Sequence, residues 1–169
     1  HCTAQALVTS QGLILLPEAE RPDLPELLDG AERVLAVVDV QHAGSRQLLD
    51  LLGLGWSEAG EPAQGLRWEV SLEGPEHRVF DTEQDVEPLV AAPLVLDQDL
   101  EALVRDDLGR PVVVRTRRGS SSVILVLDPR LLQNESLGGE REKPWVYGPE
   151  REAAHRLALR LIWAIYPKP

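Results

Sequence analysis

The polar side chains best suited to chemistry in this sequence come directly after two aliphatic runs. They are Asp39, His42 and Ser45 after the first run, and Asp128 and Asn134 after the second. An imidazole beside a carboxylate can act as a general base, so Asp39, His42 and Asp128 would serve a hydrolase, whereas the whole set would serve to bind a ligand. The competing interpretation is that the two aspartates only fix turns through side-chain to backbone hydrogen bonds.

No complete catalytic motif accompanies these residues. The sequence contains no G-x-S-x-G or G-x-C-x-G segment, which would present a nucleophile at a sharp turn between a strand and a helix. Ser120, Ser121 and Ser122 are consecutive, but they belong to an expected hairpin turn, where small polar residues are common. Gly53 and Gly55 follow an expected helix, whereas the glycines of a phosphate-binding loop precede one. We therefore assign no catalytic residue.

Metal and cofactor sites are not expected either. The histidines are scattered without the spacing of metal ligands, and the acidic run from Asp81 to Glu87 lacks the glycine of a calcium loop. The single cysteine, Cys2, excludes an internal disulfide and a multi-thiol metal site. Cys2 is a lipid-modified N-terminus, a free thiol or an incidental residue, and the sequence leaves all three open.

The charge of the chain bears on its partners. The formal net charge is -11, and so acidic a surface repels phosphate backbones. Nucleic acid is therefore not an expected partner. Arg115, Arg117 and Arg118 would form either a local basic patch or the solvated tips of a hairpin.

A strand followed by a helix is the clearest local unit. The run from Arg33 to Asp39 lacks polar alternation after its first residue, which favours a strand covered on both faces, as in a parallel sheet. After a polar turn, Ser45 is expected to cap a leucine-rich helix that ends at Gly53 and Gly55. Because ligands of open α/β sheets bind beyond the carboxyl ends of parallel strands, this unit would deliver Asp39 and its neighbours to such a site.

A second unit is an antiparallel hairpin at residues 111–127. Its two β-branched runs flank Arg117–Ser120, a glycine-containing link of hairpin length. The other expected elements are strands at 13–16, 66–72 and 94–96, a short helix at 25–28, a helical turn at 100–104, and a closing helix at about 150–166.

These elements predict a single α/β domain spanning residues 1–169. Buried strands alternating with capped helices favour a three-layer α/β/α sandwich with a mostly parallel sheet, to which the hairpin adds an antiparallel edge. The chain has no methionine and begins at His1, which indicates a processed protein or a fragment of a longer one. No apolar run reaches the ~18 residues of a membrane span, so membrane association would come only through segments outside this chain.

The loop at residues 135–148 offers a second candidate surface. It contains Trp145 and Tyr147, and these two side-chain types are typical anchors of protein interfaces. Loops of this length in compact domains are often functional. The alternative is that both rings cover the core of the domain itself.

Two segments of the chain resemble a known family. Gly109–Val114 and Ser122–Leu137 are similar to a motif of glutamine-amidotransferase-like domains in uncharacterised prokaryotic membrane proteins: a strand, a glycine turn, a strand ending in Asp, then a short helix with Asn. Related domains occur in auxiliary subunits of gliding-motility-type ABC transporters. Arg33–Asp39 with Ser45–Gly53 resembles the second βα unit of this family, and the helix that ends at Trp163 fits as well.

This resemblance implies a flavodoxin-like three-layer fold whose amidotransferase triad has been lost, because neither the elbow cysteine nor a His-x-Glu pair is present. It implies a non-catalytic domain, extracytoplasmic or membrane-associated, that binds a protein partner or a small ligand. The alternative expectation is a hydrolase whose active site lies at the carboxyl ends of the parallel strands and uses Asp39, His42 and Asp128.

Overall fold

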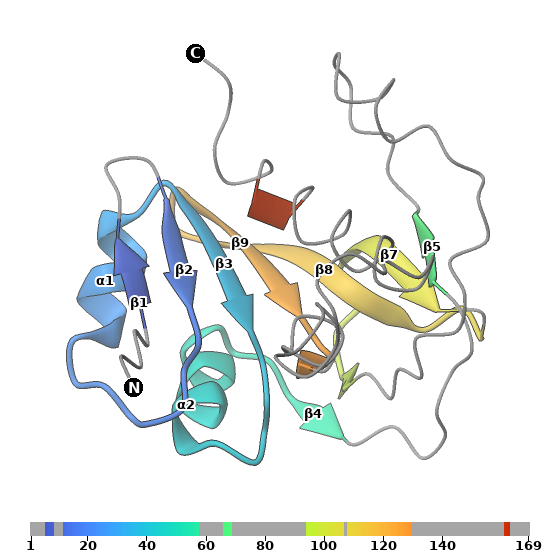
Figure 1. Cartoon of the computed structure of the whole chain (residues 1–169), viewed down its shortest axis with the longest axis horizontal. Coiled ribbons are helices and arrows are strands. Elements are labelled where there is room, and N and C mark those ends of the chain that lie inside the picture. The colour runs from blue at the N-terminus through green and yellow to red at the C-terminus, as the bar shows by residue number, and fades with distance from the viewer. Residues whose placement is uncertain are drawn as a thin grey trace, which may run out of the picture.

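The computed structural model describes residues 6–8, 12–57, 66–68, 94–106, 108–129 and 161–162. The fold is mixed α/β, with one large sheet, a separate two-stranded pair and two helices in the described part of the chain (Figure 1). The elements are β1 Ala6–Val8, β2 Leu13–Leu15, α1 Leu24–Gly30, β3 Arg33–Val37, α2 Ala43–Leu51, β4 Trp56–Ser57, β5 Leu66–Trp68, β6 Val95–Leu96, β7 Glu101–Asp106, β8 Pro111–Arg118 and β9 Ser121–Val126.

The large sheet has the strand order β1-β2-β3-β9-β8-β7-β5. Strand β3 pairs in parallel with β2 on one side and with β9 on the other. The remaining described pairings of this sheet, β1–β2, β5–β7, β7–β8 and β8–β9, are antiparallel. The expected parallel arrangement therefore holds for the three strands β2, β3 and β9 and does not extend across the sheet.

The expected strand-to-helix unit is present as β3 and α2. Strand β3 is buried along most of its length, as its unbroken apolar run predicts. Helix α2 ends at the expected glycine: Gly53 has a φ of 67°, and its N–H donates to Asp50 O at 3.0 Å. The next N–H, of Leu54, donates to Leu49 O at 3.0 Å. These two hydrogen bonds form a Schellman motif, which only a residue tolerant of positive φ closes without strain.

The hairpin is confirmed as β8 and β9, but its place in the sheet differs from the expectation. Arg118 pairs with Ser121, so the loop consists of Gly119 and Ser120, and Gly119 has the positive φ of 57° that a tight hairpin turn requires. The prediction of an antiparallel edge was wrong, because β9 lies in the centre of the sheet against β3. A strand with its first residues in a hairpin can still pair in parallel through its free side, and local sequence does not reveal this.

The prediction of a helical turn at residues 100–104 was also wrong, because strand β7 begins at Glu101. Ala102, Leu103 and Val104 are buried there, and β7 pairs with β8 through an irregular register. A short apolar run of this kind is compatible with either a helix or a strand. Pairing with the β-branched strand β8 decides in favour of the strand.

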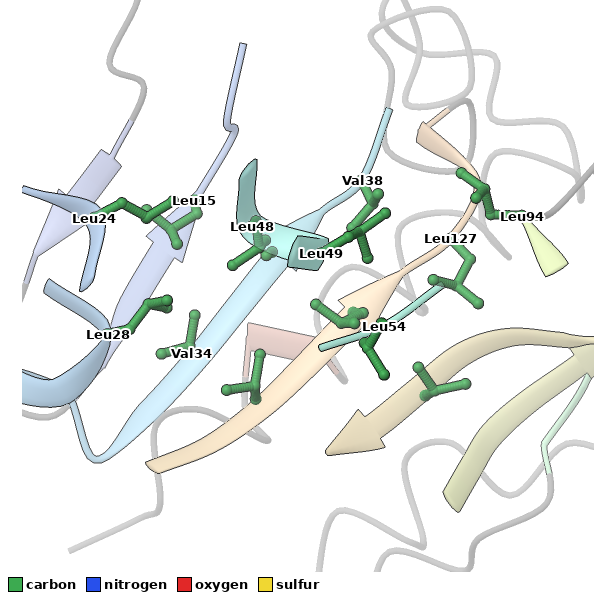
Figure 2. Close-up of a cluster of buried hydrophobic side chains, with 14 of the residues drawn as sticks. Leu15, Leu24, Leu28, Val34, Val38, Leu48, Leu49, Leu54, Leu94 and Leu127 are labelled. Carbon is green, nitrogen blue, oxygen red and sulfur yellow. The ribbon is translucent and has the colours of Figure 1, made fainter. Parts of the chain in front are cut away.

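Buried apolar side chains cover both faces of the sheet. The larger cluster contains side chains of β2, β3 and β9 together with Leu24 and Leu28 of α1 and Leu48 and Leu49 of α2. Figure 2 shows these side chains gathered between the two helices and the strands. Alternate residues of β3 and β9 point into a second cluster, which includes Leu161. Since Leu161 and Ile162 are helical, they agree with the expected closing helix, most of which lies outside the described residues.

Among the described residues, no helix has the length and apolar character needed to cross a membrane.

Candidate functional site

The carboxyl ends of β2, β3 and β9 lie at one end of the sheet, because the three strands run in the same direction. We call this end the carboxyl edge and define it by residues 16–23 after β2, residues 38–42 after β3, and residues 127–129 after β9. Val37 pairs with Val126, so Asp39 and Asp128 both come two residues after paired positions. The prediction that these two aspartates reach the same end of the sheet is therefore confirmed.

Asp39 and His42 lie close together at this edge. His42 Nε2 is 3.6 Å from Asp39 Oδ2, and both side chains are partly exposed to solvent. The other carboxylate oxygen of Asp39 accepts the N–H of Gln41 at 3.0 Å, and the Asp39 carbonyl accepts the N–H of His42 at 2.9 Å. The carboxylate thus fixes the turn, as one interpretation of the sequence expected, and also faces the imidazole.

Ser45 is not the helix cap that was expected, because α2 begins two residues earlier, at Ala43. Its side chain is buried, with 1% of the residue exposed. The Ser45 hydroxyl accepts the N–H of Asp39 at 3.0 Å and donates to the carbonyl of Pro17 at 3.2 Å. The hydroxyl therefore joins the backbone after β3 to the backbone after β2.

The segment after β2 is held against the same helix by further contacts. The N–H of Arg21 donates to Gln47 Oε1 at 2.8 Å, and Gln47 Nε2 donates to the carbonyl of Arg21 at 2.9 Å. Gly44 lies so close to the backbone of the loop after β2 that a Cβ built on it would be 2.7 Å from the carbonyl oxygen of Pro17. Sequence reasoning missed Gly44 and Gln47 because their partners are more than 20 residues away in the chain.

Arg46 holds the other segment of the edge. Its Nη1 atom donates to the carbonyl of Val40 at 2.6 Å and to that of Gln41 at 3.3 Å. The backbone that carries the Asp39–His42 pair is therefore fixed by two side chains of α2: Ser45 holds the N–H of Asp39, and Arg46 holds the two carbonyls between Asp39 and His42. Such support on a helix favours a rigid arrangement of the pair.

An exposed ion pair lies at the end of the loop after β2. Arg21 donates through Nε and Nη2 to the Asp23 carboxylate at 3.0 and 2.8 Å. The hydrogen bond from Arg21 lowers the pKa of the Asp23 carboxyl group, and the same bond raises the pKa of the Arg21 guanidinium. Because both groups are exposed, this pair positions the loop more than it stabilises the fold.

Asp128 differs from Asp39 in its surroundings. Only 1% of Asp128 is exposed, so it is part of the interior at the end of β9. A buried carboxylate is normally hydrogen-bonded, and Asp128 does take part in a polar interaction. The other predicted site residues, Asn134, Trp145 and Tyr147, lie outside the described residues.

A second buried acid is the last residue of β7, where the chain turns towards β8. The side chain of Asp106 is fully buried and accepts the N–H groups of Leu108 and Arg110 at 3.1 and 2.7 Å and the Nε of Arg110 at 2.6 Å. Since β7 runs in the same direction as β9, this turn lies at the same end of the sheet as the carboxyl edge. Sequence reasoning missed Asp106 because it assigned the preceding residues to a helical turn.

The basic residues of the hairpin do not form an unpaired patch. Arg115 Nη1 lies 3.3 Å from Glu101 Oε1, and Arg118 Nε lies 3.0 Å from Asp29 Oδ1. Arg118 also donates from Nη1 to the carbonyl of Leu51 at 2.6 Å. Two of the three arginines are thus engaged in contacts with neighbouring elements. No group of three or more His, Cys, Asp and Glu side chains in the described part of the chain could hold a metal ion.

Comparison with known proteins gives likenesses among solved structures. No protein-family model matches the chain, and no curated protein matches it. Among solved structures, it is similar to the exo-β-1,4-mannosidase Op5Man5 from Opitutaceae bacterium strain TAV5, with 14% sequence identity and a TM-score of 0.49. The likeness covers 94% of this chain and 26% of the mannosidase chain, so this chain spans about a quarter of that enzyme's length. A likeness at this level carries no inference about activity.

Proposed function

We propose that this chain is a non-catalytic binding domain of a membrane-associated protein and that the carboxyl edge contacts a protein partner or a small ligand. The observation that carries the proposal is the engagement of Ser45, whose buried hydroxyl bonds to the backbone of Asp39 and Pro17. The residue that could have served as a nucleophile beside Asp39 and His42 is therefore used to hold two loops together.

The geometry of a serine hydrolase requires a hydrogen bond from the serine hydroxyl to the imidazole, which in turn is oriented by the carboxylate. Here the carboxylate of Asp39 does face the imidazole of His42 at 3.6 Å. The hydroxyl of Ser45 instead donates to Pro17 O. Two members of a triad without the third supply a polar, hydrogen-bonding surface.

The features of this surface suit binding. His42 and Gln41 are exposed, and Asp39 is partly so. The backbone that carries them is fixed by Ser45 and Arg46 of α2. Little conformational entropy is lost when a ligand binds to a surface that is already ordered, which favours recognition.

The membrane association rests on the resemblance to catalytically degenerate glutamine-amidotransferase-like domains. The strands that carry this resemblance, β3, β8 and β9, form the centre of the sheet. We extend the proposal to a flavodoxin-like three-layer fold, in which a helical layer covers the second cluster around Leu161. The same resemblance supports an extracytoplasmic or membrane-associated location, with membrane segments outside this chain, and Trp145 and Tyr147 as a further contact site for a protein.

Site-specific photo-crosslinking, carried out in the cells that produce the protein, tests the proposal. A photoreactive residue replaces the exposed Gln41 at the carboxyl edge, or the exposed Ser120 at the opposite end of the sheet as a control. We expect a discrete adduct from position 41 only, and its loss when Asp39→Asn and His42→Ala are added. Equal adducts from both positions, or none from position 41, would contradict the proposal.

The alternative function, a hydrolase using Asp39, His42 and Asp128, is favoured by one observation, the 3.6 Å approach of His42 to Asp39. It requires a water nucleophile, since Ser45 is engaged. The purified chain can be assayed with ester, amide, phosphate and glycoside substrates, with His42→Gln as the matched variant. Turnover that disappears in His42→Gln and persists in Ser45→Ala would establish the hydrolase and overturn the non-catalytic proposal.

A further inference from the structure

One buried hydroxyl joins two loops of the carboxyl edge that come from different strands. Ser45 Oγ accepts the N–H of Asp39, in the loop after β3, at 3.0 Å. It donates to the carbonyl of Pro17, in the loop after β2, at 3.2 Å. Because the hydroxyl is buried, water does not readily replace either partner, and separating the loops leaves a polar group unsatisfied.

The same helix holds the loop after β2 at two further points. Gln47 makes a reciprocal pair of hydrogen bonds with the backbone N–H and carbonyl of Arg21. The N–H of Gly44 donates to the carbonyl of Glu18 at 3.3 Å. The first half of α2 therefore bonds to residues 17–21 at three places and to Asp39 at one.

We propose that this part of α2 makes the two loops one conformational unit, so that residues 17–21 and the Asp39–His42 pair change conformation together. The physical reason is that a shared donor or acceptor links the two loops without an intervening flexible segment, and hydrogen-bonded networks of this kind respond as a group. A ligand bound to one loop then alters the affinity of the other by linkage. The regulatory consequence rests on the proposed function, whereas the coupling itself is a property of the ligand-free protein.

Amide hydrogen exchange of the full chain, read by NMR, tests the coupling. The informative amides are those of Arg21, Gly44 and Asp39, which belong to three separate segments. In Gln47→Leu, which removes both contacts to Arg21, we expect exchange at Asp39 to accelerate at least about threefold along with that at Arg21, the size expected for a lost hydrogen bond. Acceleration at Arg21 alone would overturn the coupling.

Ser45→Ala provides the complementary measurement. It removes the shared hydroxyl, and we expect faster exchange at both Asp39 and Arg21, although the N–H of Arg21 donates to Gln47 and the Ser45 hydroxyl bonds to Asp39 and Pro17. Arg118→Ala is the matched control, since it removes a hydrogen bond to the far end of α2, at Leu51 O. Exchange at the carboxyl edge is expected to stay unchanged in this control.

The two proposals fail in distinguishable ways. Coordinated exchange without any crosslinked adduct at position 41 would retain the coupling and remove the binding function. An adduct at position 41 with exchange confined to Arg21 in Gln47→Leu would retain the binding function and remove the coupling.

Discussion

Asp39 and Asp128 each follow, by two residues, the paired residues Val37 and Val126 of the parallel strands β3 and β9. They occupy equivalent positions along the sheet but differ in burial. Asp39 is partly exposed and fixes a turn through the N–H of Gln41, whereas Asp128 is buried. Equivalent placement at the end of a strand therefore does not give the two carboxylates equivalent roles.

The difference in burial predicts different costs of truncation. Asp128→Ala is expected to lower the free energy of unfolding by about 2 kcal/mol, because removing a buried polar group leaves its surroundings with unsatisfied partners. Asp39→Ala is expected to cost less than half as much, since water replaces the carboxylate at the turn. Urea unfolding of both variants measures the difference. Equal costs would show that Asp128 is not an interior group in solution.

The close contact at Gly44 predicts that a single added methyl group strongly lowers the stability of the fold. Gly44→Ala is expected to lower the free energy of unfolding by about 2 kcal/mol, since the added Cβ would overlap the carbonyl oxygens of Pro17 and Ala19. Gly30→Ala is the matched control: nothing lies within 4 Å of a Cβ at Gly30, at the end of α1. There the same change is expected to raise stability by about 0.5 kcal/mol, through reduced backbone entropy of the unfolded chain. Thermal unfolding of the two variants tests the opposite signs.

The buried acid Asp106, at the end of β7, predicts a third difference in the free energy of unfolding between two variants. Asp106→Ala is expected to cost about 3 kcal/mol, because it leaves the Arg110 guanidinium and two backbone N–H groups without their acceptor. Glu101→Ala removes an acid that also faces an arginine, Arg115, but from an exposed pair, and is expected to cost far less. Chemical denaturation compares the two. A cost for Glu101→Ala that matched Asp106→Ala would contradict the role of burial.

The Arg21–Asp23 pair predicts a pH effect of defined sign. The hydrogen bond from Arg21 lowers the pKa of the Asp23 carboxyl in the folded chain. The pair therefore contributes stability above the pKa of the unfolded chain, and the contribution disappears as the pH falls through the lowered pKa of the folded chain. A carboxyl-detected NMR titration is expected to place the pKa of Asp23 below that of an aspartate in an unstructured peptide. Arg21→Gln is expected to raise it; no change in this variant would show that another group is responsible.

Several elements could be predicted because their signals are local. The run ending at Val37, the glycine that ends α2 and the glycine at position 119 each act within a few residues, through burial or positive φ. Strands β2 and β6 and helix α1 were expected for the same reason. These elements also place Asp39 and Asp128 at one end of the sheet, so the location of the candidate site followed from the sequence.

The remaining features depend on contacts between distant residues. The central position of β9 depends on its pairing with β3, which lies more than 80 residues earlier in the chain. The role of Ser45 depends on Pro17, 28 residues away, and this partner turns an expected helix cap into a link between loops. Strand β7 was read as a helical turn because its short apolar run carries no decisive period. Pairing energies and burial against remote segments decide these cases, and no local pattern reports them.

The central position of β9 has a consequence for biosynthesis. Before residue 121 leaves the ribosome, β1-β2-β3 and β5-β7-β8 are two separate groups of strands, each with an unpaired edge facing the gap that β9 fills. Exposed strand edges of this kind promote intermolecular association. A nascent or prematurely terminated chain that ends before β9 is therefore expected to aggregate, and a chaperone that shields these edges would raise the yield of folded protein.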